Sequence, residues 1–238
     1  MADSQAIADW MRAQVEKAGL NGIALGLSGG IDSALAAVLA QKACGENVLG
    51  IIMPCHSIDQ DADHALRLAR EFNIETALAD LGPAFDALQE QLPEGTQLAQ
   101  ANLKPRLRML TIYYMANTRG YMVAGTGNRS ELAVGYFTKY GDGGVDMLPL
   151  GNLLKLEVRE MAREVGVPEE IIDKPPSAGL WEGQTDEEEM GFTYDELDRI
   201  VARAAKADFA PETKTEQLIH NMMQRSDHKK RLPPIFEG

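Results

Sequence analysis

A short glycine-rich segment could hold the phosphates of a nucleotide. It consists of Leu27, Ser28, Gly29, Gly30, Ile31, Asp32 and Ser33. The segment follows an apolar run predicted to be a strand and precedes a predicted helix over residues 32–44. Glycines let the backbone approach an anion, serine hydroxyls donate hydrogen bonds, and a helix N-terminus adds free N–H groups and a positive dipole. The segment lacks the lysine of a Walker A loop. The alternative is a strand-to-helix turn in which Asp32 and Ser33 only cap the helix.

A second polar segment follows the strand expected over residues 121–125. It contains GTGNRSE at 125–131 and GYFTKYGDGGVD at 135–146. Ligands bind at the carboxyl ends of strands in open α/β sheets, which is where this segment begins. By composition alone, however, it would be a surface loop with scattered charge.

These segments resemble known families. SGGIDS, at 28–33, resembles the loop of the ATP pyrophosphatase superfamily, in which ATP is split between its α and β phosphates. The second segment resembles NAD synthetases, as do NLKPRLRM at 102–109, KPPSAGL at 174–180 and HKKRLP at 228–233. The second proline and the glycine of KPPSAGL, and Lys-Pro at 104–105, depart from the commonest family pattern. The resemblance spans about residues 23–233, in order.

This resemblance implies roles for individual residues. The implied ATP contacts are Gly26 and the segment at 27–33, together with Thr126, Lys155 and Ser177. Asp32 and Glu131 would bind Mg²⁺, which prefers hard oxygen ligands. The implied contacts to nicotinic acid adenine dinucleotide are Arg106, Lys139, Asp146, His228 and Lys229.

The resemblance also implies a two-step reaction. The nicotinate carboxylate attacks the α-phosphorus of ATP and releases pyrophosphate, and ammonia then displaces AMP to give NAD. We expect Lys155 and Mg²⁺ to stabilise charge, and we expect Asp142 to accept the proton of ammonium. A chain of 238 residues has no room for the amidase domain of glutamine-using relatives, so free ammonia is the expected donor. A separate glutaminase subunit stays open.

Composition limits the other classes of function. The net charge is −13, which argues against a general nucleic-acid binder or a membrane-surface protein. A few lysines, an arginine and Mg²⁺ can still neutralise phosphates locally. No apolar run approaches the length of a membrane span. The two cysteines are expected to be buried fillers in a reducing compartment, so we expect a cytoplasmic protein.

The hydrophobic pattern predicts alternating strands and helices. Strands are expected at 23–27, 48–53, 74–81 and 121–125, and helices within 1–19 and at 32–44, 59–72 and 105–119. Such alternation predicts an α/β fold: a doubly wound parallel sheet, Rossmann-like and of the ATP pyrophosphatase type, with helices on both faces. We expect one domain over residues 1–238.

Several features have competing interpretations. Residues 103–115 are apolar around much of the helix, which indicates either a central core helix or a surface covered by a second subunit. The second alternative, with the family's habit, predicts a homodimer. We interpret residues 185–188 as a capping box rather than a metal cluster. We expect His56, His64 and His220 to be ordinary packing or surface residues. Rival functions are another amidating or thiolating ligase and a non-catalytic nucleotide sensor.

Overall fold

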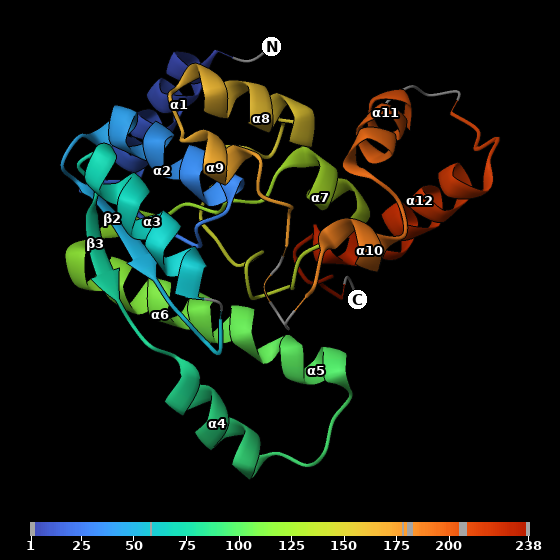
Figure 1. Cartoon of the computed structure of the whole chain (residues 1–238), viewed down its shortest axis with the longest axis horizontal. Coiled ribbons are helices and arrows are strands. Elements are labelled where there is room, and N and C mark those ends of the chain that lie inside the picture. The colour runs from blue at the N-terminus through green and yellow to red at the C-terminus, as the bar shows by residue number, and fades with distance from the viewer. Residues whose placement is uncertain (1–2, 58, 178, 180–182, 205–208, 237–238) are drawn as a thin grey trace.

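A computed structural model gives the structure of residues 3–57, 59–177, 179, 183–204 and 209–236. Its sheet has the strands β1 (Gly22–Gly26), β2 (Val48–Ile52), β3 (Glu75–Leu78) and β4 (Tyr121–Val123). All are parallel and lie in the order β3-β2-β1-β4 (Figure 1). The predicted α/β fold with a parallel sheet is confirmed.

Helices cover both faces of the sheet. Successive side chains of a strand point to opposite faces, so each strand contributes to two cores. Ile23 and Leu25 of β1 join the core beneath α2 (Ile31–Cys44), whereas Ala24 joins the core beneath α6 (Leu103–Arg119). The first core also contains side chains of α1 (Ser4–Ala18), α3 (Asp59–Glu71), α8 (Lys155–Glu164) and α9 (Glu169–Ile172). Phe85 of α4 (Gly82–Gln91) contributes to the second.

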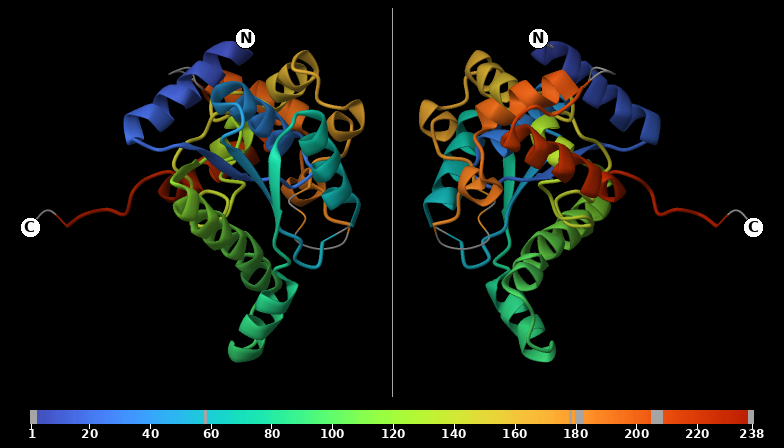
Figure 2. Two further views of the ribbon diagram at one scale, coloured as in Figure 1. Left: turned by 90° about the vertical axis from the view of Figure 1, so that its left-hand side faces the viewer. Right: turned by 90° about the vertical axis from the view of Figure 1, so that its right-hand side faces the viewer.

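A third apolar cluster lies beside the sheet. It joins α7 (Arg129–Val134), α10 (Asp186–Met190), α11 (Tyr194–Ala204) and α12 (Lys214–Arg225). A 3-10 turn at Asp227–Lys229 follows, and the chain then extends away from the body (Figure 2). The short helix α5 (Gln97–Ala101) precedes α6, and α4 and α5 project from one end of the molecule.

The apolar helix predicted over residues 103–115 is not a central core helix. Ala116 is buried and Ile112 packs on the sheet, but Leu110 and Tyr114 are 63% and 74% exposed. One side of α6 therefore covers β1 and β4, and the other side presents apolar atoms at the surface of this chain.

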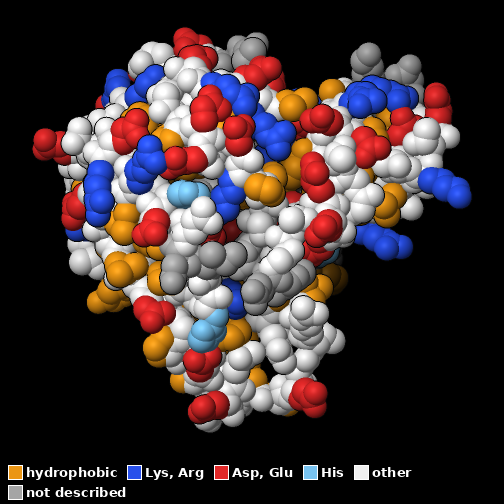
Figure 3. Space-filling view, in the orientation of Figure 1, with side chains coloured by type: hydrophobic (Ala, Val, Ile, Leu, Met, Phe, Trp, Pro, Cys, Tyr) orange, Lys and Arg blue, Asp and Glu red, His pale blue; other side chains and the backbone are white. Residues whose placement is uncertain are grey.

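The surface charge is mixed rather than uniformly acidic on the face seen in Figure 3, where basic and acidic side chains are interspersed. An anion can therefore meet local positive charge despite the net charge of −13. Among the described residues, none of the helices is both long and apolar enough to cross a membrane.

Candidate active site

The glycine-rich segment forms a turn between β1 and α2. Ser33 Oγ accepts a hydrogen bond from the Ser28 backbone N–H at 3.2 Å and donates one to the Gly30 carbonyl at 2.9 Å. Gly30 is the N-cap of α2, and no side chain caps this helix terminus. Asp32 and Ser33 are therefore not N-caps. The N-terminal N–H groups of α2 lack a side-chain acceptor, which suits a phosphate.

The order of the strands determines where this turn lies. The chain crosses from one side of β1 to the other, because β2 and β4 are its two neighbours. At such a reversal the loops after the two adjacent strands separate and leave a crevice at their carboxyl ends. The glycine-rich segment, from here on called the phosphate loop, follows β1, and residues 124–131 follow β4. The two glycine-rich segments of the sequence therefore meet at one edge of the sheet.

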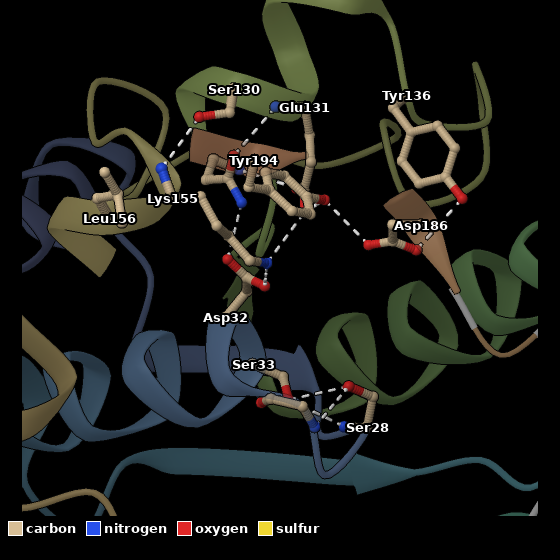
Figure 4. A network of polar contacts seen from close by, with 12 residues as sticks. Ser28, Asp32, Ser33, Ser130, Glu131, Tyr136, Lys155, Leu156, Asp186 and Tyr194 are labelled. Carbon is tan, nitrogen blue, oxygen red and sulfur yellow. Dashed lines mark hydrogen bonds and ion pairs between the residues drawn. The ribbon is translucent and has the colours of Figure 1, made fainter. Parts of the chain in front are cut away.

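Three predicted site residues meet near these two segments: Asp32, Glu131 and Lys155. The Lys155 ammonium forms an ion pair with Asp32 and a second with Glu131 Oε1 at 3.4 Å (Figure 4). Lys155 is only 1% exposed, whereas the two carboxylates are partly open to solvent. Three different elements, α2, α7 and α8, thus place one cation between two anions.

Burial and charge shift the pKa values of this cluster. Burial, with the Asp32 carboxylate nearby, raises the pKa of Glu131 to about 8. Burial alone would lower the pKa of Lys155, but the Asp32 and Glu131 carboxylates outweigh it and raise that pKa. Lys155 is therefore positively charged, and its single positive charge is shared between two carboxyl groups.

A buried layer of polar residues holds the cluster in place. Asn128 Nδ2 donates to Asp32 Oδ1 at 2.8 Å, while its Oδ1 caps α7 by accepting from Glu131 N. Ser130 Oγ accepts from the Lys155 backbone N–H at 3.0 Å and donates to Asp198. Asn128 and Ser130 thus hold the Asp32 carboxylate and the N-termini of the helices that carry Glu131 and Lys155.

Asp198 lies in α11 and is buried. Its Oδ2 accepts from the Leu156 backbone N–H at 2.9 Å, so it caps the start of α8, next to Lys155. A carboxylate here also meets the positive end of the helix dipole. Asp198 therefore joins the α10–α12 part of the chain to the helix that carries Lys155.

Tyr194 and Asp186 line the side of the cluster that faces α10 and α11. The Lys155 ammonium faces the Tyr194 ring, with Nζ 4.9 Å from the ring centroid. Its hydroxyl donates to Asp186 Oδ2 at 2.9 Å, and Tyr136 donates to Asp186 Oδ1 at 3.2 Å. Burial raises the pKa of Asp186. Thr185 is the N-cap of α10, as predicted, and accepts from Glu188 N, whereas the reciprocal bond of a capping box is not among the hydrogen bonds of the described residues.

The residues predicted to contact the dinucleotide form a second group around the 135–146 loop. Arg106 donates to the Lys139 carbonyl at 3.4 Å, and Lys139 Nζ donates to the His228 carbonyl at 2.6 Å. Lys229 Nζ donates to the carbonyls of Gly135 and Phe137 at 2.8 and 2.9 Å. Among the described residues, these hydrogen bonds lead to the loop rather than to Lys155.

Two acidic residues of the same loop have structural partners. Asp142 is exposed, and its Oδ1 accepts from the Thr138 backbone N–H at 2.9 Å. Asp146 accepts from the Tyr113 hydroxyl at 2.8 Å and from the Val123 backbone N–H at 2.9 Å. Asp142 therefore contacts the backbone of its own loop, and Asp146 anchors the end of the loop to β4 and α6.

The remaining two predicted ATP contacts, Thr126 and Ser177, lie in segments that follow β4 and α9. Thr126 lies three residues after the end of β4 at Val123. Ser177 is exposed and accepts from the Gly179 N–H at 3.1 Å. Ala178 and Leu180 of the predicted KPPSAGL segment lie outside the described residues.

The residues that sequence reasoning missed are Asn128, Ser130, Asp186, Tyr194 and Asp198. One signal was available for Asp198. In the helix over residues 194–204, Leu197 and Val201 define the apolar face, and Asp198 interrupts it. A carboxylate on an apolar helix face needs a buried partner.

The donors present fit a magnesium ion. Asp32 and Glu131 supply two carboxylates, partly open to solvent, and Glu131 is short of positive charge. Mg²⁺ is usually bound by one or two carboxylates plus water and substrate phosphates. Among the described residues no group of three or more His, Cys, Asp or Glu side chains could hold a metal. The site therefore suits an ion shared with phosphates.

Comparisons with known proteins agree with this geometry. A family model described as NAD synthase matches residues 4–233. The NH(3)-dependent NAD(+) synthetases of Carboxydothermus hydrogenoformans and Archaeoglobus fulgidus are each 47% identical, covering 98% and 96% of this chain and 96% and 94% of their own. The NMN synthetase structure from Francisella tularensis has a TM-score of 0.92 and 38% identity, covering 99% of this chain and 97% of its own. The structure of an NH3-dependent NAD synthetase from Campylobacter jejuni has a TM-score of 0.83 and 30% identity, and the match covers 98% of this chain and 97% of that one.

Proposed function

The chain belongs to the NAD synthase family, and from that premise we propose that it makes NAD from nicotinic acid adenine dinucleotide, ATP and ammonia. The observation that carries this proposal is the buried Lys155, held between Asp32 and Glu131 beside an uncapped phosphate loop. A carboxylate does not react with ammonia directly, so ATP first converts it to an adenylate, and AMP then leaves as the amide forms.

In this proposal the residues at the start of α2 and α8 act on ATP. Residues 26–33 bind the phosphates through backbone N–H groups and serine hydroxyls. Lys155 stabilises negative charge that develops when pyrophosphate leaves, and its burial in a site of low dielectric strengthens that effect. Thr126 and Ser177 complete the ATP contacts.

We further propose Asp32 and Glu131 as the protein ligands of Mg²⁺. When bound, the ion would supply positive charge to the phosphates. Lys155 contacts both carboxylates, so its ammonium and the ion would share the same pair of anions.

The second group of residues is proposed to bind the dinucleotide. Arg106, Lys139 and Lys229 place positive charge around the 135–146 loop, with His228 and Asp146 at its borders. Asp142 lies in the same loop and is exposed, so it can reach an incoming ammonium ion and accept its proton.

We also propose that the active form is a homodimer. Leu110 and Tyr114 place apolar surface on the outer side of α6, and covering it would remove that surface from water. Light scattering should give twice the chain mass, and a fully active monomer at micromolar concentration would refute the proposal.

The test of the function is an incubation with nicotinic acid adenine dinucleotide, ATP, magnesium and ammonium. NAD, AMP and pyrophosphate should form in equal amounts. ADP as the nucleotide product would contradict the proposal, and ATP binding without turnover would favour a nucleotide sensor.

A second candidate substrate is nicotinic acid mononucleotide, which would give nicotinamide mononucleotide by the same chemistry. The similarity to the NMN synthetase of Francisella tularensis favours it, since that structure covers nearly the whole chain. Comparing kcat/KM for the two substrates decides between them. We expect a higher value for the dinucleotide, because two relatives that are each 47% identical to this chain are NH(3)-dependent NAD(+) synthetases.

A further inference from the structure

An ion pair outside the proposed catalytic cluster joins two segments that flank the phosphate loop. Lys174 follows α9, Asp61 lies in the first turn of α3, and the Lys174 ammonium contacts Asp61 Oδ1. The two residues are 113 positions apart in the chain. Each side chain is 26% exposed, so the pair is partly shielded from water.

The backbone of Asp61 lies directly against Gly29 of the phosphate loop. A Cβ atom placed on Gly29 would come within 2.2 Å of the Asp61 carbonyl oxygen, and Gly29 has a φ of +77°. Only glycine fits both the conformation and the close approach. Because the same residue carries the ion pair, Lys174 fixes the backbone that packs on this part of the loop.

The other end of the Lys174 segment is also fixed. The Pro176 carbonyl accepts a hydrogen bond at 3.0 Å from the backbone N–H of Asp186, whose side chain accepts from Tyr194 in the wall of the cluster. Ser177 follows Pro176 immediately. The segment that carries Ser177 is therefore tied to the phosphate loop through Lys174 and to the catalytic cluster through Pro176.

We propose that Lys174 and Asp61 are positioning residues for ATP. Their ion pair fixes the spacing between the phosphate loop and Ser177, the two sides of the proposed ATP site. This inference rests on the proposed function. The inference goes beyond that function because it assigns a role to two residues outside the catalytic cluster. Among the described residues, Lys174 and Asp61 make no hydrogen bond to Asp32, Glu131 or Lys155.

The test uses Lys174→Gln, Asp61→Asn, the double variant and Lys174→Arg. Each of the first two should weaken binding of a non-hydrolysable ATP analogue about fivefold, which corresponds to about 1 kcal/mol. The double variant should be no weaker than either single variant, since one interaction is lost in all three. Lys174→Arg keeps the charge and should stay within twofold of wild type.

Kinetics separate positioning from a general loss of structure. The KM for ATP should rise in the single variants, while the KM for the dinucleotide and the thermal unfolding temperature stay within error. The matched control is Arg67→Gln, which removes an ion pair between α3 and Glu170 of α9, two turns along the same helix. It should leave ATP binding unchanged.

Three results would overturn the inference. Additive losses in the double variant would show that the two residues act separately. An Asp61→Asn variant that binds the analogue as well as wild type, beside a defective Lys174→Gln, would mean that Lys174 meets the phosphates itself. An equal rise in the KM for both substrates would indicate a general structural role. If wild type fails to make NAD, the proposed function fails, but analogue binding still tests the ion pair.

Discussion

Replacing Lys155 by methionine tests whether the central ion pair serves both stability and catalysis. Methionine keeps much of the length and apolar character of the side chain but removes its charge. The variant leaves Asp32 and Glu131 without their shared cation, in a site where burial already raises the pKa of Glu131 to about 8.

The expected cost follows from the geometry. At 3.4 Å, an effective dielectric constant of about 20 gives roughly 5 kcal/mol of gross attraction between Lys155 and Glu131. Desolvation offsets part of this attraction, and removing one partner of a buried pair typically costs about 3–5 kcal/mol. Since small domains are stable by about 5–15 kcal/mol, the variant should still fold, with a clearly lowered free energy of unfolding.

Urea unfolding and NAD synthesis measure the two effects separately. We expect a loss in kcat of at least about 100-fold, because charge stabilisation at the phosphates is removed. Adding Glu131→Gln to Lys155→Met should recover part of the stability, since it removes an unpaired carboxylate, but it should recover no activity. Arg163→Gln, in the exposed part of the same helix, is the control and should cost less than about 1 kcal/mol. Wild-type stability in Lys155→Met, or activity regained in the double variant, would refute the reasoning.

Three further predictions concern neighbouring residues. Glu131→Gln should raise the magnesium concentration needed for half-maximal activity, and unchanged activity at limiting magnesium would make Glu131 a structural residue. Asp142→Asn should slow NAD formation by ~100- to 10,000-fold while dinucleotide-dependent exchange of labelled pyrophosphate into ATP persists. Parallel loss of both reactions would instead assign Asp142 to the shape of the loop, in which it accepts from Thr138 N. Asp198→Asn weakens the cap of α8 and should lower the free energy of unfolding by about 2 kcal/mol, and a urea midpoint equal to that of wild type would contradict it.

The fold could be predicted because its signals are local. The apolar runs that became β1 and β2 are short and bounded by glycine or proline, and the helix between them has a clear start and end. The alternation of strands and helices then left a parallel sheet as the expected arrangement. The boundaries of these elements differ from the structure by at most three residues, as with β3, which covers Glu75–Leu78 rather than 74–81.

The arrangement of the site was only partly predictable. Asp32, Glu131 and Lys155 are far apart in the sequence, and only the strand order brings the loops that follow β1 and β4 together. Their roles came from a family resemblance, not from spacing. Asp186 was read as part of a helix cap, because a local pattern explains such a residue before any distant partner is known. The partner, Tyr194, could be identified only from the folded chain.

In the proposed function, the charge of the cluster explains why ATP and a metal ion would bind together at this site. Above about pH 8, where Glu131 is ionised as well, Asp32, Glu131 and Lys155 carry a net charge of about −1, so the cluster alone repels a polyphosphate. The phosphate loop offers dipoles rather than full charges, and the proposed dinucleotide-binding cations lie at a different loop. A divalent cation held by the two carboxylates would reverse the local sign and let the phosphates approach. Glu131→Gln reduces the negative charge and removes a metal ligand at once. If the metal is what attracts ATP, affinity must fall in that variant; if bare electrostatics governs binding, it must rise.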